Sequence, residues 1–99
     1  MSLQVFYTAY SKETLRSVYN FIHNKFGAGP ADKFILRTEK IISLIAKQPL
    51  MFKATTIDEK VRVGFISNQT SLFYRVTDDA VHLLFFWDNR QEAVLPQYK

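Results

Sequence analysis

Two amphipathic segments that follow each other with almost no linker constrain the fold of this chain most. The first stripe has the spacing of one helix face and consists of Leu15, Val18, Tyr19, Ile22 and Phe26. The second consists of Phe34, Thr38, Ile41, Ile42 and Ile45, widened by Ile35 and Leu44. Because only a few residues around Gly29 separate the stripes, the two helices must lie antiparallel as a hairpin. Each helix has one apolar face, so the hairpin needs a flat surface to cover.

The ends of these helices carry local signals. Residues 3–8 are rich in β-branched and aromatic types, which predicts a short strand before the first helix. Ser11 is predicted to cap the N-terminus of that helix, and Gly27 stands at the left-handed position that ends it. Pro30 suits the first position of the second helix, and Pro49 stops it.

The second half of the chain supplies the surface that the hairpin needs. Residues 61–66 alternate in the period of two that is typical of a strand. Two more strands, residues 72–76 and 81–87, flank a tight turn at Asp78-Asp79. Residues 50–59 are expected to connect the helices to this sheet, and residues 88–99 form a polar tail.

The order β-α-α-β-β-β predicts an α+β fold. We expect an antiparallel helical hairpin packed on one face of a small, curved, mostly antiparallel sheet. With 99 residues, 47% of them hydrophobic, the chain is expected to form a single domain over residues 1–99.

A turn at residues 78–79 fixes which side chains share a face of the sheet. The face predicted to lie under the helices carries Leu72, Tyr74, Val76, Val81, Leu83 and Phe85. The opposite face carries Ser71, Phe73, Arg75, His82, Leu84 and Phe86, with Arg75 directly across from His82. Arg62 of the preceding strand is expected to share this second face.

This second face is predicted to remain partly in water, because no further element is large enough to bury it. An exposed apolar area of several hundred Å² usually marks an interaction site. Cations among aromatic rings suit a negatively charged partner segment. The alternative, that residues 88–99 fold back and cover the face, stays open.

Composition limits the remaining chemistry. The chain has no cysteine and two histidines, so we expect no disulfide, no thiol nucleophile, no metal site and no cofactor. No run approaches the ~18 apolar residues of a membrane span, so no membrane partner is expected. The net charge of +4 is concentrated in residues 12–53, which suits nucleic acid, an acidic partner or simple solubility.

The segment VRVGFISNQTSLFYRVTDDAVHLLFFWDNRQ, residues 61–91, combines an Arg-bearing strand, a strand ending Phe-Tyr-Arg-Val and an apolar strand closing in Trp-Asp-Asn-Arg-Gln. This segment and the order of elements over residues 3–92 resemble the RelE/ParE superfamily of bacterial toxins. The resemblance implies a cytoplasmic toxin of a type II toxin–antitoxin pair. It leaves a homodimer open.

The resemblance also implies two alternative activities. RelE-like members cleave mRNA on the ribosome, whereas ParE-like members have no nuclease and poison DNA gyrase. Arg62 stands where the nuclease branch has a lysine, and Arg90 falls at or beside its arginine. Gly64 replaces a second lysine and Ser71 a central arginine, while Tyr98 lies one or two places later than the matching tyrosine. Arginine is a poor proton carrier, so this nuclease set is incomplete.

We therefore expect a ParE-like toxin that acts by binding protein, with DNA gyrase as its target and a small antitoxin that neutralises it. The residues expected to bind a partner are Arg62, Phe73, Arg75, His82, Leu84, Phe86 and Arg90. The alternative is a RelE-like ribosome-dependent mRNA endoribonuclease with a reduced site of Arg62, Arg75, Arg90 and Tyr98.

Several of these residues also have a purely structural interpretation as members of salt bridges. Arg62 and Arg75 are also compatible with ordinary surface salt bridges, for which the candidate partners are Asp58, Glu59 and Asp78. An Asp88–Arg90 pair is expected to brace the turn after the last strand.

Overall fold

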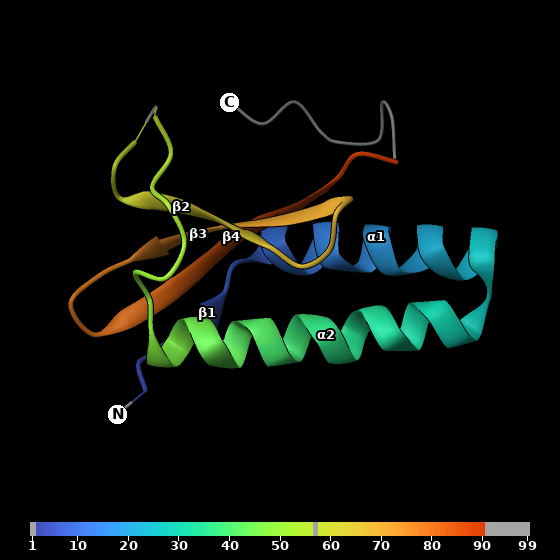
Figure 1. Ribbon diagram of the computed structural model, residues 1–99, viewed down its shortest axis with the longest axis horizontal. Helices are drawn as coiled ribbons and strands as arrows, with labels where there is room; N and C mark the ends of the chain where they lie inside the picture. Colours follow the sequence, from blue (N-terminus) through green and yellow to red (C-terminus); the bar gives the residue numbers. More distant parts are fainter. Residues whose placement is uncertain (1, 57, 91–99) are drawn as a thin grey trace.

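The computed structural model describes residues 2–56 and 58–90, and its elements follow the predicted order. They are β1 (Gln4–Tyr7), α1 (Ala9–Phe26), α2 (Ala28–Lys47), β2 (Val61–Phe65), β3 (Thr70–Val76) and β4 (Ala80–Asp88) (Figure 1). The four strands form one sheet in the order β1-β4-β3-β2, with β1 parallel to β4 and the other pairs antiparallel. The predicted α+β fold is confirmed.

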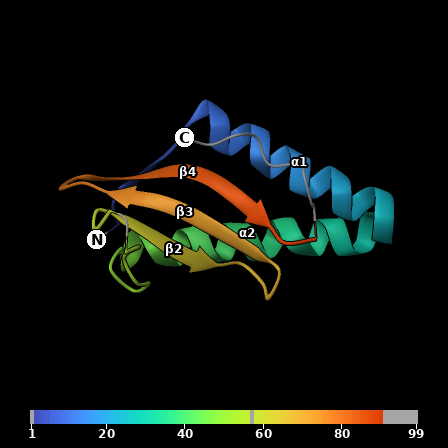
Figure 2. The same ribbon diagram turned by 90° about the horizontal axis from the view of Figure 1, so that it is seen from above.

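The two helices form the predicted hairpin and lie together on one face of the sheet (Figures 1 and 2). Gly27 alone separates them, and its φ of +100° lies in the region that only glycine enters without strain. The core between hairpin and sheet consists of Val18, Ile22, Ala31, Phe34, Ile42, Ile45, Ile66, Leu72, Tyr74, Val81, Leu83 and Phe86. Burial of these apolar side chains is the main force that holds the two layers together.

The N-terminus of α1 differs from the prediction. The cap is Thr8, whose Oγ1 accepts a hydrogen bond from the Ser11 amide at 3.0 Å. Ser11 lies inside the helix and donates its own hydroxyl to the Thr8 carbonyl at 2.8 Å. Thr8 takes the capping position because β1 ends at Tyr7, so the chain turns from strand into helix within one residue.

Helix α1 also completes the edge of β4 that β1 leaves unpaired. Strand β1 pairs only with Ala80–Leu83. At the end of this range Thr8 Oγ1 donates to the Leu83 carbonyl at 2.8 Å, and further along β4 the Phe86 amide donates to Thr14 Oγ1 at 2.9 Å. The Thr14 hydroxyl therefore satisfies a buried amide that β1 does not reach, and the Thr8 hydroxyl adds a second hydrogen bond to a carbonyl that the Thr8 amide already contacts.

The outer edge of β2 is partly covered by the segment that follows α2. Ala54 forms a bridge with Arg62, and the Val63 amide donates to the Lys53 carbonyl at 3.1 Å. Tyr74 from β3 donates its hydroxyl to the Pro49 carbonyl at 3.0 Å. The predicted connection is thus a loop that is tied to the sheet.

A bulge in β4 changes the predicted register. Arg75 pairs with His82 and Tyr74 with Leu83, as predicted, but Phe73 then pairs with Phe85. Leu84 is the extra residue, so every later side chain of β4 changes face.

The prediction that Phe86 lies on the exposed face and Phe85 under the helices is therefore wrong. Phe86 is 0% exposed and belongs to the core, whereas Phe85 stacks on Phe73 on the other face.

The predicted position of Arg62 is also wrong. Arg62 pairs with Tyr74, a core residue, while its neighbour Val61 pairs with Arg75. Because side chains alternate along a strand, Arg62 and Arg75 lie on opposite faces of the sheet. Arg62 Nη1 donates to the Phe52 carbonyl at 2.6 Å and so holds the segment after α2.

The bulge predicts a large loss of stability for truncation of one aromatic residue and a small effect for truncation of its neighbour. Phe86→Ala is expected to lower the free energy of unfolding by about 3–5 kcal/mol, because it leaves a cavity in the core. Trp87→Ala is expected to change it by less than about 1 kcal/mol, because Trp87 is 42% exposed. Urea unfolding followed by circular dichroism measures both. The reverse order of the two effects would contradict the observed register.

Candidate functional site

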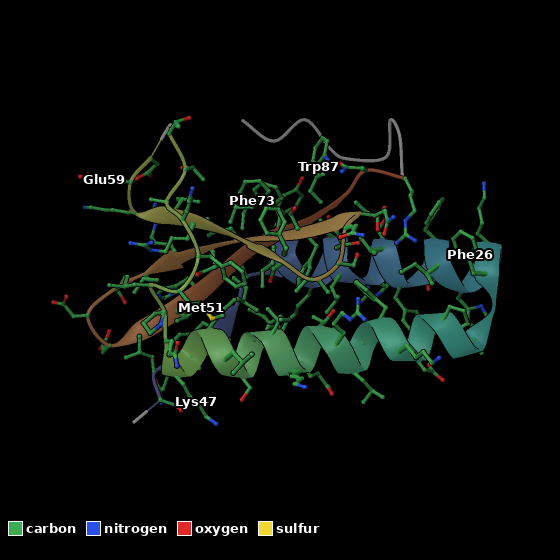
Figure 3. All side chains as sticks on the ribbon, in the orientation of Figure 1. Phe26, Lys47, Met51, Glu59, Phe73 and Trp87 are labelled. Atoms are coloured by element: carbon green, nitrogen blue, oxygen red, sulfur yellow. The ribbon has the colours of Figure 1, made fainter. Side chains whose placement is uncertain are left out.

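The sheet face opposite the helices is the principal candidate site. We define the open face as the side chains of Val61, Val63, Phe65, Ser71, Phe73, Arg75, His82, Phe85 and Trp87, which register places together. Among residues 2–56 and 58–90, no helix lies on this side (Figure 2). Figure 3 shows Phe73 and Trp87 pointing away from the helical layer.

The pairing of the strands arranges the open face in rows. Phe65, Ser71 and Trp87 form one row across β2, β3 and β4, and its two aromatic rings are 62% and 42% exposed. Phe73 and Phe85 belong to the next row, where their rings stack with centroids 4.5 Å apart. The first row is exposed enough to serve as an anchor for a partner, because large aromatic side chains contribute most to such contacts.

The stacked row is more enclosed than its position suggests. Phe85 is only 8% exposed, because Phe73 lies over it and Tyr10 from the start of α1 contacts it with centroids 5.8 Å apart. Phe73 itself is half-buried. Phe73 therefore offers an apolar surface to a partner, while Phe85 supports it from beneath.

The third row carries two polar side chains, Arg75 and His82, between Val61 of β2 and Phe6 of β1. Arg75 Nη2 lies 3.8 Å from Asp58 Oδ2, and both side chains are about half exposed, so this pair contributes little to stability. The ring of His82 stacks on Phe6 of β1 at 5.4 Å. The simpler interpretation of Arg75 as a surface salt bridge is confirmed.

Arg90 is fixed at the end of β4 by a buried carboxylate. Its Nε and Nη2 donate to Asp88 Oδ1 and Oδ2 at 3.1 and 2.8 Å, and its backbone amide also donates to Oδ1 at 2.8 Å. Asp88 is 0% exposed and accepts a further hydrogen bond from Thr70 Oγ1. The predicted Asp88–Arg90 brace is confirmed.

Arg90 also connects the strand to the helical hairpin. Its guanidinium lies 5.9 Å from the ring centre of Phe21 and 5.7 Å from that of Phe26, within the range of a cation–π contact. The side chain therefore holds the end of β4 against α1.

The environment of Asp88 lowers the pKa of its carboxyl. Burial is the largest single influence and would raise this pKa, but the hydrogen bonds from Arg90 and Thr70 and the charge of Arg90 together outweigh it. Asp88 is therefore ionised in the folded state, and Asp88 in turn raises the pKa of Arg90.

The residues of the predicted nuclease set do not converge. Arg62 lies on the helix side of the sheet, Arg75 on the open face and Arg90 at the end of β4. Tyr98 lies outside the described residues. At Gly64, where the nuclease branch has a second lysine, a Cβ atom would lie 2.9 Å from Cδ2 of Phe52, so the Phe52 ring fills the space.

Five residues of the open face were not predicted to lie there. Phe85 was placed under the helices by a regular register, which the bulge at Leu84 invalidates, and Trp87 was not assigned to a face. Val61, Val63 and Phe65 were identified as part of a strand but not assigned to this face. Leu84, predicted as a partner-binding residue, is half-buried in the bulge itself.

Comparison with known proteins identifies the family. The sequence profile described as "ParE toxin of type II toxin-antitoxin system, parDE" matches residues 5–93. The chain belongs to this ParE toxin family. Among curated proteins, none matches the toxin.

Solved structures share the fold of the toxin. The chromosomal ParDE system from P. aeruginosa is similar with a TM-score of 0.74 and 13% identity, over 88% of this chain and 96% of that chain. The RelBE2 toxin–antitoxin complex from Mycobacterium tuberculosis has a TM-score of 0.66 and 15% identity, over 89% of this chain and 99% of that chain. The YoeB dimer from Staphylococcus aureus has a TM-score of 0.63 and 12% identity, over 88% of this chain and 97% of that chain. Structures from both a ParDE system and a RelBE2 complex thus share the fold of this chain.

The lengths and hydropathies of the two helices bear on whether either could span a membrane. Within the part of the chain that the structure describes, neither α1 nor α2 is long and apolar enough to cross a bilayer.

The Asp88 brace gives a pH-dependent prediction. Asp88→Asn is expected to lower the free energy of unfolding by about 2–3 kcal/mol at pH 7, because hydrogen bonds to a charged group are lost in a buried position. The folded pKa of Asp88 lies below its ordinary value of 3.8, so its contribution is present above that value and is lost as the pH falls through the folded pKa.

The difference in stability between the toxin and this variant should therefore narrow below about pH 4. Asp78→Asn, in the exposed turn before β4, serves as the matched control and should track the unchanged toxin at every pH. Thermal unfolding monitored from pH 3 to pH 7 measures all three. A difference that stays constant down to pH 3 would contradict the assignment.

Proposed function

We propose that this toxin acts by binding protein, that a small antitoxin neutralises it by covering the open face, and that DNA gyrase is the target of the free toxin. The observation that carries the proposal is the exposed row of Phe65 and Trp87 beside the half-buried Phe73, on a face that no other described element covers. A surface of this kind is typical of a recognition site, since it combines exposed aromatic rings with a polar border.

The chemistry of the antitoxin segment follows from the rows of the open face. Apolar side chains of the segment would pack on Phe65, Phe73 and Trp87, and an acidic side chain would reach Arg75 in place of Asp58. Replacing the Asp58 carboxylate by one from the antitoxin costs little free energy, because the existing ion pair is long and solvated. The similarity to ParDE and RelBE2 assemblies supports a small protein as this partner.

Gyrase is favoured over mRNA because the cations required for RNA cleavage are dispersed. Cleavage needs an acid, a base and positive charge around one phosphate. In the described residues, Arg62, Arg75 and Arg90 lie at three separate places, and each already has an oxygen partner. The match to the ParE family supports the branch that the sequence resemblance associates with gyrase.

The two targets are distinguished by inducing the toxin alone in bacteria. We expect growth arrest with trapped gyrase–DNA breaks, together with ribosome-bound mRNA whose cleavage pattern is unchanged. Gel analysis of plasmid DNA after denaturation measures the breaks, and sequencing of mRNA 5′ ends measures cleavage. New mRNA ends without DNA breaks would overturn the gyrase proposal in favour of the ribonuclease.

The open face is tested through antitoxin binding. Phe65→Asp combined with Trp87→Asp is expected to weaken binding by about 100-fold or more, because two exposed aromatic anchors are lost. The probe is the purified cognate antitoxin, and calorimetry measures its affinity for each variant.

Leu36→Asp combined with Leu50→Asp is the matched control, because both leucines are exposed and neither belongs to the open face. This control should bind within about twofold of the unchanged toxin. Equal weakening by the two double variants, or no weakening by the first, would contradict the assignment. Circular dichroism should show that both remain folded.

A further inference from the structure

A second concave site lies away from the open face. A cavity of about 340 Å³ opens between the far halves of α1 and α2, the turn between β2 and β3, and Arg90. None of its lining residues belongs to the open face. We call it the basic cup, defined by the apolar residues Ile22, Phe26 and Phe34 and the cations Lys33, Arg37 and Arg90.

The apolar floor of the cup exists because the hairpin is longer than the sheet. Helices of 18 and 20 residues extend about 27 and 30 Å, and their joined ends project past the strands (Figure 1). Phe26, labelled at that projecting end in Figure 3, is 51% exposed. The apolar stripe that packs on the sheet at Val18 thus continues through the buried Ile22 to Phe26, whose ring is exposed in the cup.

The rim of the cup concentrates positive charge. Lys33 and Arg37 are four residues apart on α2, so their side chains leave the same face of the helix. Within the described residues neither forms a salt bridge, whereas Arg90 is paired with Asp88. Among the described residues, the cup therefore has about two positive charges without a salt-bridge partner, and a concave wall of low polarity strengthens their field.

We propose that the basic cup binds a phosphate monoester carried on a planar aromatic body, the chemistry of a nucleoside 5′-monophosphate. A phosphate monoester has a charge between about −1.5 and −2 at neutral pH, which matches the two free cations, whereas one carboxylate matches half of them. Its three terminal oxygens accept hydrogen bonds from Lys33 and Arg37 on one wall and from the remaining guanidinium donors of Arg90 opposite. The planar body then lies on the exposed ring of Phe26.

This inference is separate from the proposed function, because the cup and the open face share no residue. If the toxin failed to bind gyrase or antitoxin, the proposal for the cup would still stand. If the cup bound no ligand, the proposal for the open face would still stand. The two proposals therefore fail independently.

The test is a titration of the ¹⁵N-labelled full chain with adenosine 5′-monophosphate at low ionic strength, followed by NMR. We expect saturable shifts at the amides of Ile22, Phe26 and Phe34, with a dissociation constant below about 1 mM. Adenosine without its phosphate should bind at least about tenfold more weakly. The absence of saturable shifts, or equal binding of adenosine, would overturn the proposal.

Matched charge variants locate the binding. Lys33→Gln combined with Arg37→Gln should weaken nucleotide binding at least about tenfold. Lys40→Gln combined with Lys47→Gln removes the same charge from the same helix outside the cup and should change affinity less than twofold. Equal losses in the two variants would show non-specific attraction to a basic helix and would overturn the site.

The ligand could be a free nucleotide or the 5′-phosphorylated end of a nucleic acid. Binding of short single strands of DNA distinguishes these two sources. A 5′-phosphorylated strand that binds tenfold more tightly than the mononucleotide identifies a nucleic-acid end, and the opposite order identifies a free nucleotide. Either result supports the cup. Equal binding by the phosphorylated strand and its 5′-hydroxyl counterpart would overturn the monoester assignment.

The chain's own acidic residue after Arg90 is the remaining competitor. Glu92 is two residues further along the sequence, so Glu92→Gln should change nucleotide affinity less than twofold if the cup serves an external ligand. A tenfold gain would show that the cup holds the carboxylate of its own chain, and would overturn the proposal.

Discussion

The extra residue at Leu84 determines which aromatic side chains are buried and which face water. Before it, β3 and β4 pair residue for residue from Val76 and Val81 to Tyr74 and Leu83. After it, Phe86 enters the core and Trp87 turns outward, because one added residue reverses the alternation of a strand. The reversed segment lies beyond the reach of β1, and Thr14 of α1 accepts the hydrogen bond of the Phe86 amide there. The bulge and the edge contact of α1 together fix the outward rings that the proposed partner would contact.

The same alternation separates the arginines that a nuclease would have to bring together. Arg62 and Arg75 are on adjacent strands, yet their pairing partners Tyr74 and Val61 place them on opposite faces. Arg62 then acts as a clamp on the segment after α2, and the close contact of Phe52 with Gly64 leaves no room for a longer side chain between them. The helix-side surface of β2 is thus used for packing, which agrees with a ParE-family toxin that acts by binding protein, as proposed above.

The helical hairpin and the strand order were predictable because their signals are local. Two apolar stripes around one glycine allow only an antiparallel pair, and the turn before β4 fixes the pairing of Arg75 with His82. The bulge was not predictable, since Leu84, Phe85 and Phe86 are all apolar and either register buries one ring. The choice between them depends on tertiary contacts: Phe86 fills the core, and Tyr10 and Phe73 shelter Phe85. For the same reason Thr8, and not Ser11, caps α1, because the point where β1 ends decides which hydroxyl is free.

The projecting end of the hairpin needs support that the sheet does not give, and Arg90 supplies it. Its guanidinium is held by both oxygens of Asp88 and lies near the rings of Phe21 and Phe26, so the last residue of the described chain ties β4 to the far half of α1. Because Asp88 neutralises it, Arg90 adds little net charge to the cup beside it. The long-range attraction for an anion must therefore come from Lys33 and Arg37, while Arg90 contributes directed donors at close range. A fixed arginine opposite two exposed cations on a helix gives the cup one rigid wall and one adaptable wall.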